Sequence, residues 1–109
     1  MAQFDVHRNQ GMLKESIPFV VIVQSSLFDQ YRRRMVVPLV RRTALASGAS
    51  TVGTRLNPVF ELKGIRVVLH PLDTVSVAVD QLGPKVDSLT QHGQAIADAL
   101  DELLTRSWG

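Results

Sequence analysis

The chain has 109 residues, a length typical of one domain, so we expect a single domain over residues 1–109. Apolar residues make up 45% and charged residues 20%, a balance typical of a folded protein and not of a disordered or fibrous one. The chain has no cysteine, which excludes disulfides, thiolate nucleophiles and cysteine-ligated metal sites.

The remaining soft metal ligands are His7, His70 and His92, which lie in three different segments without the spacing of a ligand pair. The sequence therefore predicts neither a metal site nor a cofactor. Its longest apolar run, residues 18–23, is shorter than the roughly 20 residues of a membrane-spanning helix. Because no secretory signal is visible at the N-terminus, the expected location is the cytoplasm.

The first half of the chain predicts three strands. Phe4 and Val6 alternate with polar residues, which predicts a strand over residues 3–7 with one buried face. A polar loop over residues 8–16 then leads to residues 17–24, whose β-branched apolar character is typical of a central strand. Residues 34–40 are also strand-like, but Pro38 lacks an amide donor. This strand must therefore lie at an edge, carry a bulge or bend.

The second half predicts a hairpin and one more strand. Residues 43–54 are rich in small residues and read as a long loop that can include a helical turn. Residues 59–62 and 65–69 form a predicted hairpin, in which Gly64 takes the positive φ of the turn. Val75, Val77 and Val79 alternate with other residues, which predicts a strand over residues 74–80.

After Gly83-Pro84 the apolar period becomes helical. The apolar positions are Leu89, Ile96, Leu100, Leu103 and Leu104. Ser88 and Gln91 have the spacing of a capping box, and Glu102 and Arg106 that of an i, i+4 ion pair. The sequence thus predicts a mainly β, antiparallel fold closed by one C-terminal helix.

Charge is unevenly distributed along the chain. Residues 1–55 contain 8 basic and 3 acidic side chains, and residues 56–109 contain 4 basic and 7 acidic ones. Much of the positive charge comes from Arg32, Arg33, Arg34, Arg41 and Arg42. Such a density favours an acidic peptide or a phosphate backbone, although a solvated face is the commonest reason for a charge run.

No phosphate-binding loop, nucleophile elbow or dinucleotide fingerprint occurs in the sequence. Arg66, His70 and Asp73 have side chains that could together cleave RNA without a metal. The same segment also fits a plain strand exit and turn.

Trp108 is the only tryptophan and lies one residue from the C-terminal carboxylate of the sequence. It either folds back to close the core under the helix or is an exposed anchor for a partner.

Several segments are similar to one known family: residues 3–6, 23–25, 33–39 (Arg-Arg-Met-Val-Val-Pro-Leu), 57–59 and 75–77, and the final Trp-Gly pair. The chain resembles the CcdB toxin family, the DNA gyrase poisons of bacterial toxin-antitoxin modules. The resemblance covers nearly the whole length and is most specific at residues 33–39 and at the C-terminus.

The resemblance implies a small SH3-like antiparallel barrel of the CcdB type, paired into a symmetric homodimer. In the family, the dimer lodges between two gyrase A subunits and traps the cleaved gyrase-DNA complex. The toxin thereby inhibits this type II topoisomerase and needs no catalytic group of its own. Trp108 would stack on a gyrase arginine. The implied gyrase-binding residues are Leu27, Phe28, Leu104, Ser107, Trp108 and Gly109.

The second partner that the resemblance implies is a CcdA-like antitoxin, whose disordered acidic tail wraps the toxin and removes it from gyrase. The implied contacts are Arg32, Arg33, Arg34, Arg41 and Arg42. Related complexes serve plasmid maintenance and repress their own promoter through the antitoxin, so operator DNA is an indirect partner.

The chain departs from the family at its end. Gyrase-poisoning members carry phenylalanine before the Trp-Gly pair and isoleucine after it, whereas this sequence has Ser107 and stops at Gly109. Losing two apolar anchors from each arm is expected to cost several kcal/mol of gyrase binding at about 25 cal/mol per Å².

Two alternatives stay open. Other toxins with this barrel cleave RNA, which would require Arg66, His70 and Asp73 to converge. A degenerate, non-toxic member would retain only antitoxin binding. Substitution of Trp108 by alanine distinguishes them, since a gyrase poison would lose toxicity, a ribonuclease would keep it, and a degenerate member would not change.

Overall fold

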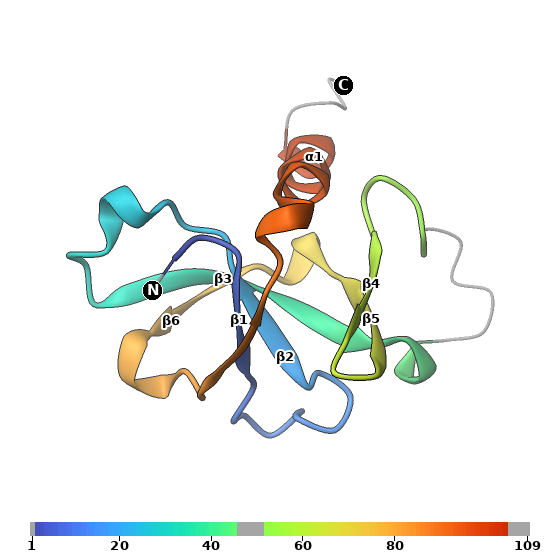
Figure 1. Cartoon of the computed structure of the whole chain (residues 1–109), viewed down its shortest axis with the longest axis horizontal. Helices are drawn as coiled ribbons and strands as arrows, with labels where there is room; N and C mark the ends of the chain where they lie inside the picture. Colours follow the sequence, from blue (N-terminus) through green and yellow to red (C-terminus); the bar gives the residue numbers. More distant parts are fainter. Residues whose placement is uncertain (1, 46–51, 105–109) are drawn as a thin grey trace.

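The computed structural model describes residues 2–45 and 52–104, which contain seven strands and one α-helix (Figure 1). The elements are β1 (Asp5–Arg8), β2 (Phe19–Ile22), β3 (Arg33–Arg41), β4 (Val59–Leu62), β5 (Ile65–Leu69), β6 (Val75–Ala78), β7 (Lys85–Ser88) and α1 (Gly93–Leu104). The strands form one sheet in the order β4-β5-β3-β2-β1-β7, and β6 pairs with β3 beside this path. Every pairing between these strands is antiparallel, so the predicted fold class is confirmed as a half-barrel sheet with a C-terminal helix.

Strand β3 lies at the centre of the sheet, although Pro38 in its middle suggested an edge, a bulge or a bend. β2 pairs with one side of β3, while β5 and then β6 follow the other side, separated by the 3₁₀ turn η3 (Pro71–Asp73). The carbonyl of Pro38 accepts the His70 N–H at 3.1 Å, so the donor that proline lacks would face this same side. The proline is therefore accommodated because the pairing on this side of β3 is interrupted between β5 and β6, and not because β3 lies at an edge.

The β4–β5 hairpin confirms the predicted turn. Lys63 and Gly64 have φ angles of 52° and 77°, the left-handed values that a two-residue type I′ turn requires at both central positions. Pairing runs from Leu62 opposite Ile65 to Val59 opposite Val68. A residue without a side chain fits this turn at position 64, as the sequence predicted.

The predicted one-sided burial of the first strand is wrong. Asp5 and His7 are each 5% exposed, as buried as the apolar residue between them, because β1 lies between β2 and β7. Asp5 lies 3.3 Å from the ammonium of Lys85 and accepts the Ala2 N–H, and His7 Nδ1 lies 2.8 Å from the Gly83 carbonyl. These contacts compensate Asp5 and His7 Nδ1 at the β1–β7 seam, whereas the buried His7 Nε2 has no hydrogen-bond partner among the described residues.

The helix starts later than predicted, because residues 85–88 form β7 and α1 begins only after the turn η5 (Thr90–His92). The predicted capping box between Ser88 and Gln91 is absent. The Ser88 hydroxyl instead accepts the Thr90 N–H at 3.2 Å, which closes a local turn after the strand. Likewise, β6 is shorter than predicted and is followed by the turn η4 (Val79–Gln81).

Helix α1 packs against the hydrophobic core through Ile96 and Ala99, both fully buried. Its acidic face meets Arg55, whose guanidinium nitrogens lie 3.6 Å from Asp98 and 3.9 Å from Glu102. Arg106, the predicted partner of Glu102, lies outside the described residues.

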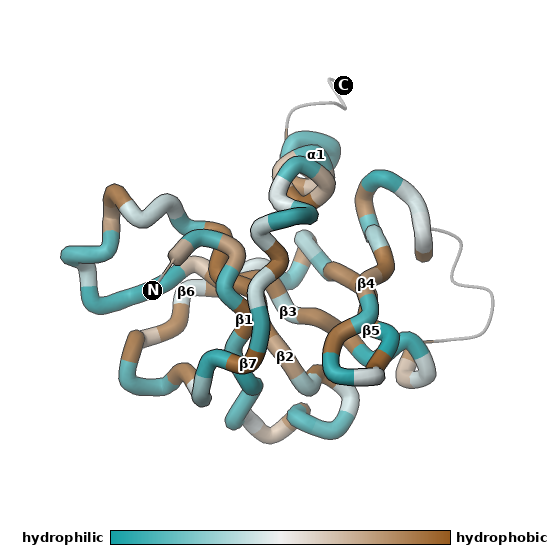
Figure 2. Tube along the Cα trace, in the orientation of Figure 1, coloured by the Kyte–Doolittle hydropathy of each residue, from teal (hydrophilic) through white to brown (hydrophobic). Residues whose placement is uncertain are grey.

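The hydrophobic core combines side chains of the sheet with Ile96 and Ala99 of α1, and hydrophobic segments run along the central strands (Figure 2). Its members come from strands β1 to β5, from Leu89 between β7 and η5, and from α1: Val6, Phe19, Val21, Val37, Leu39, Phe60, Leu62, Val67, Leu69, Leu89, Ile96 and Ala99. Within residues 2–45 and 52–104, no helix has the length and hydrophobicity needed to cross a bilayer.

Candidate interaction site

The connection between β2 and β3, residues 23–32, carries two exposed apolar side chains that the sequence predicted to bind a partner, Leu27 and Phe28. We call it the β2–β3 loop. Leu27 is 84% exposed and Phe28 is 49% exposed on the 3₁₀ turn η1 (Ser26–Phe28). This turn stands out from the sheet on the same side as α1 (Figure 1). Large apolar side chains in this position gain free energy when a partner covers them.

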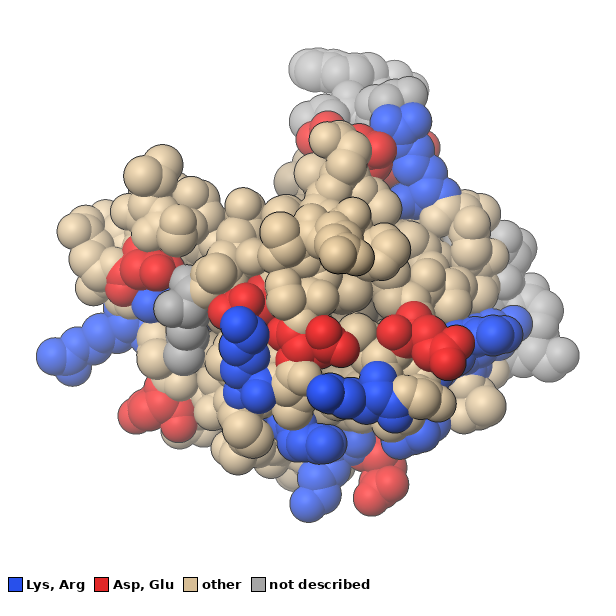
Figure 3. All heavy atoms as spheres, in the orientation of Figure 1, with Lys and Arg blue, Asp and Glu red and all other residues tan. Residues whose placement is uncertain are grey.

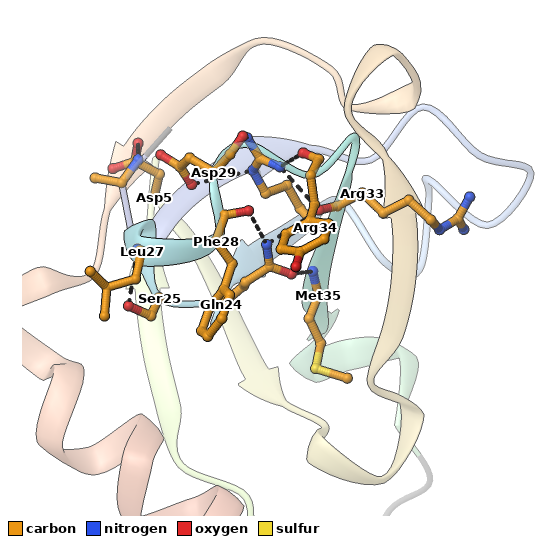
Figure 4. A network of polar contacts seen from close by, with 11 residues as sticks. Asp5, Gln24, Ser25, Leu27, Phe28, Asp29, Arg33, Arg34 and Met35 are labelled. Carbon is orange, nitrogen blue, oxygen red and sulfur yellow. Dashed lines mark hydrogen bonds and ion pairs between the residues drawn. The ribbon is translucent and has the colours of Figure 1, made fainter.

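The local sequence fixes the shape of this turn. The Ser25 hydroxyl accepts the Leu27 N–H at 3.2 Å, as an N-capping serine does. The amide of Gln24 connects the two ends of the loop, because it donates to the carbonyls of Phe28 and Arg33 at 3.3 Å and accepts the Met35 N–H at 3.1 Å (Figure 4). The apolar pair is thus presented on an ordered backbone.

Arg34 holds the loop from inside the protein. Its side chain is 6% exposed, and its guanidinium donates to the carbonyls of Tyr31, Arg33 and Asp29 (Figure 4). Its Nε lies 3.5 Å from the Asp29 carboxylate. One buried cation therefore binds two carbonyls of the loop and the carbonyl of Arg33 at the start of β3, which makes the loop conformation depend on this residue.

A groove of about 620 Å³ adjoins the exposed turn. Phe28, Tyr31 and Met35 provide apolar lining, and Arg32 and Arg33 also line the groove. Tyr31 is 57% exposed and its ring centroid lies 6.3 Å from that of Phe28. Tyr31 and Met35 were not predicted from the sequence, although both are large apolar or aromatic residues that line the same groove as Phe28.

The five predicted antitoxin-binding arginines fall into three classes of exposure. Arg32 and Arg33 are exposed, Arg41 and Arg42 are half-buried, and Arg34 is buried in the loop network. Arg33 also donates to the hydroxyl and the carbonyl of Ser76 at 2.8 and 2.6 Å. Arg34 could have been placed from the sequence, because strand alternation puts it on the same face as Val36.

The predicted residues of the C-terminal arm are described only in part. Leu104, the last residue of α1, is 74% exposed. Ser107, Trp108 and Gly109 lie outside the described residues.

The structure brings together two of the three residues considered for RNA cleavage. His70 Nδ1 lies 3.4 Å from the Asp73 carboxylate across the exposed turn η3. Arg66 is four residues of β-strand away from His70, a separation of about 13 Å between Cα atoms. Elsewhere in residues 2–45 and 52–104, no three potential metal-ligating side chains form a group.

Comparisons with known proteins are consistent with this architecture. The chain matches the family model described as CcdB protein over residues 3–106. Among solved structures, it is similar to the Mycobacterium tuberculosis toxin MazF-mt6, with a TM-score of 0.70 and 16% sequence identity over 95% of this chain and 99% of that chain. A search of curated sequences finds no significant match. At this identity the MazF-mt6 likeness concerns the fold, whereas the family model spans nearly the whole sequence. The chain therefore belongs to the CcdB protein family and is a toxin of the toxin-antitoxin type.

Proposed function

We propose that this protein binds the A subunit of DNA gyrase and stabilises the complex in which gyrase is joined to cleaved DNA. The observation that carries the proposal is the exposed Leu27–Phe28 pair on its ordered turn, at the positions where the family resemblance implies contact with gyrase. The toxin would act by binding one state of another enzyme, so its surface and not a catalytic group determines its effect.

The proposed contact surface has two parts. The β2–β3 loop provides Leu27 and Phe28, and the C-terminal arm provides Leu104, Ser107, Trp108 and Gly109. Leu104, the last residue of α1, is 74% exposed. Helix α1 lies on the side of the sheet from which η1 projects (Figure 1). Trp108 would stack on a gyrase arginine, a contact worth about 0.5 to 2 kcal/mol.

Titration of purified gyrase A subunit into the toxin by calorimetry tests the loop contact. Leu27→Ala is expected to weaken binding about tenfold or more, because it removes a large apolar anchor. Leu72→Ala is the matched control, since Leu72 is 76% exposed but lies on the turn η3. Equal affinity of wild type and Leu27→Ala would contradict the proposed surface.

The proposal includes neutralisation by a CcdA-like antitoxin with an acidic segment. Arg32, Arg33, Arg41 and Arg42 are accessible for such a contact, whereas Arg34 would support it indirectly through the loop. Operator DNA would be reached only through the antitoxin, and the expected location remains the cytoplasm.

A symmetric homodimer is the proposed active form. Support comes from family membership and from exposed apolar side chains outside the β2–β3 loop, including Met12 at 100% and Val75 at 50%. Light scattering at micromolar concentration is expected to give twice the mass of the chain, and a monomer mass would contradict the dimer.

Ribonuclease activity is the second candidate, favoured only by the His70–Asp73 pair. A ribonuclease would degrade RNA with the purified wild type and lose this activity in His70→Ala. The gyrase proposal expects no RNA cleavage by either protein.

A further inference from the structure

Three arginines from neighbouring segments line one hollow beside the β4–β5 hairpin. Arg41 ends β3, Arg42 begins the turn η2 (Arg42–Ala44), and Arg66 lies on β5. The hollow has a volume of about 440 Å³ and is also lined by Thr43, Glu61, Gly64 and Ile65. We call it the arginine notch. Arg66 was considered above for RNA cleavage, but the structure places it here and not beside His70.

Strand register accounts for this convergence. Arg41 is opposite Val67 in the β3–β5 pairing, and continuing the register by one residue brings Arg42 opposite Arg66. Like charges directly opposite each other on neighbouring strands are destabilising unless an anion lies between them. Glu61 is the cross-strand partner of Arg66 and the only acidic side chain of the notch. Three arginines and one glutamate therefore line the notch.

The arginines retain free hydrogen-bonding capacity. Arg41 uses its Nε to donate to the Glu15 carbonyl at 3.0 Å, which anchors the side chain and leaves its two terminal amino groups available. Among the described residues, Arg42 and Arg66 have neither a hydrogen bond nor an ion pair from their guanidinium groups. Arg42 is also half-buried, so its charge is only partly solvated.

We propose that the arginine notch binds the carboxylate side chains of an acidic protein segment. Guanidinium groups bind carboxylates through two parallel hydrogen bonds, and adjacent arginines can hold two acidic residues of one chain. The inference rests on the proposed antitoxin contact and deepens it, because it adds Arg66 to that contact and groups it with Arg41 and Arg42.

A nucleic-acid backbone fits the notch less well. A phosphate backbone needs an extended basic track, whereas basic and acidic side chains are interleaved on the face seen in Figure 3. The small volume also suits a few side chains better than a duplex.

The notch lies at the opposite end of β3 from the groove of the β2–β3 loop. Arg33 begins this strand and Arg41 ends it, which separates their Cα atoms by about 26 Å in an extended strand. Acidic side chains in the notch would therefore not touch Leu27 or Phe28 directly. Binding at the notch can be measured separately from binding at the loop.

The test is a fluorescence-anisotropy titration of the full chain against a labelled ten-residue peptide that contains two adjacent glutamates in each half. Arg66→Gln is expected to weaken peptide binding about tenfold, and Glu61→Gln to strengthen it by a factor of about two or more. Lys14→Gln is the control for net charge, because Lys14 is exposed in the loop before β2, and its effect is expected to be less than twofold.

Equal weakening by Lys14→Gln and Arg66→Gln would overturn the notch, since it would indicate attraction by net charge alone. Tighter, Arg66-dependent binding of a labelled twelve-nucleotide oligothymidylate would assign the notch to nucleic acid and would also overturn the proposal. Thermal melts confirm that each variant is folded. Because the titration contains no gyrase, a negative result would contradict only the notch and not the gyrase contact. A failure of gyrase binding would likewise not contradict the notch.

Discussion

Gly93, the first residue of α1, lies directly against the ring of Phe4, and a Cβ at position 93 would be 2.6 Å from Phe4 Cε2. Phe4 has a positive φ of 71°, which is strained for an aromatic residue. Its backbone is fixed on both sides, because its N–H donates to Ile22 at 2.6 Å and its carbonyl accepts the Leu89 N–H at 2.8 Å. The N-terminal segment thus determines where the C-terminal helix can begin.

Gly93→Ala is expected to destabilise the protein by about 1 to 3 kcal/mol, because the new methyl group must displace the Phe4 ring or the helix. This loss would exceed the gain in helix propensity, which is at most about 1 kcal/mol. Urea denaturation measures the change. The exposed Gln94→Ala is the control and should stay within about 0.5 kcal/mol of wild type. A Gly93→Ala variant as stable as wild type would show that the ring is free to move.

The two turn residues of the β4–β5 hairpin should respond to substitution with opposite signs. Gly64→Ala is expected to lower the free energy of unfolding by about 1 kcal/mol, because alanine disfavours the φ of 77°. Lys63→Asn is expected to raise it by a few tenths of a kcal/mol, since asparagine tolerates the left-handed region better than lysine. Thermal denaturation of both variants checks the signs. Destabilisation by Lys63→Asn would contradict the assigned turn.

Arg34→Met is expected to cost about 2 to 4 kcal/mol of stability, because it leaves loop carbonyls and the Asp29 carboxylate without the guanidinium. Arg33→Met removes the same charge from the neighbouring exposed residue and should cost less than about 1 kcal/mol. Chemical denaturation compares the two. Equal losses would indicate that total charge, and not the buried network, matters here.

The same network predicts that Arg34 also affects the binding of gyrase A. At a temperature where both variants are folded, Arg34→Met should weaken gyrase A binding, because the Leu27–Phe28 turn loses its fixed backbone. A milder Arg34→Lys variant should weaken binding less. Undiminished binding by folded Arg34→Met would show that the turn keeps its shape without the guanidinium.

Strands β1 to β6, including the β4–β5 hairpin, could be predicted from sequence because their signals are local. The turn at Gly64 and the apolar run around β2 needed no information from distant residues. The start of α1 could not be predicted this way. Ser88 and Gln91 have the spacing of a helix cap, but residues 85–88 form a strand that pairs with the distant β1. The burial of Asp5 and His7 likewise depends on β7, which the local pattern did not reveal.

For the candidate site, the family resemblance located the Leu27–Phe28 pair, and its exposure follows from the short turn that carries it. The grouping of Arg66 with Arg41 and Arg42 depends on the register between β3 and β5, which sequence alone did not specify. The opposite roles of Arg33 and Arg34 follow from strand alternation, a signal that a run of three arginines obscures.

A DNA cleavage assay tests the central claim most directly. Purified gyrase, supercoiled plasmid and ATP are incubated with wild type, Trp108→Ala, Leu27→Ala or Leu72→Ala, and linear DNA is measured after detergent and protease treatment. The account predicts linear DNA with wild type and Leu72→Ala and a strong reduction with the other two. Absence of linear DNA with wild-type protein, or equal amounts with all four, would contradict gyrase poisoning through this surface.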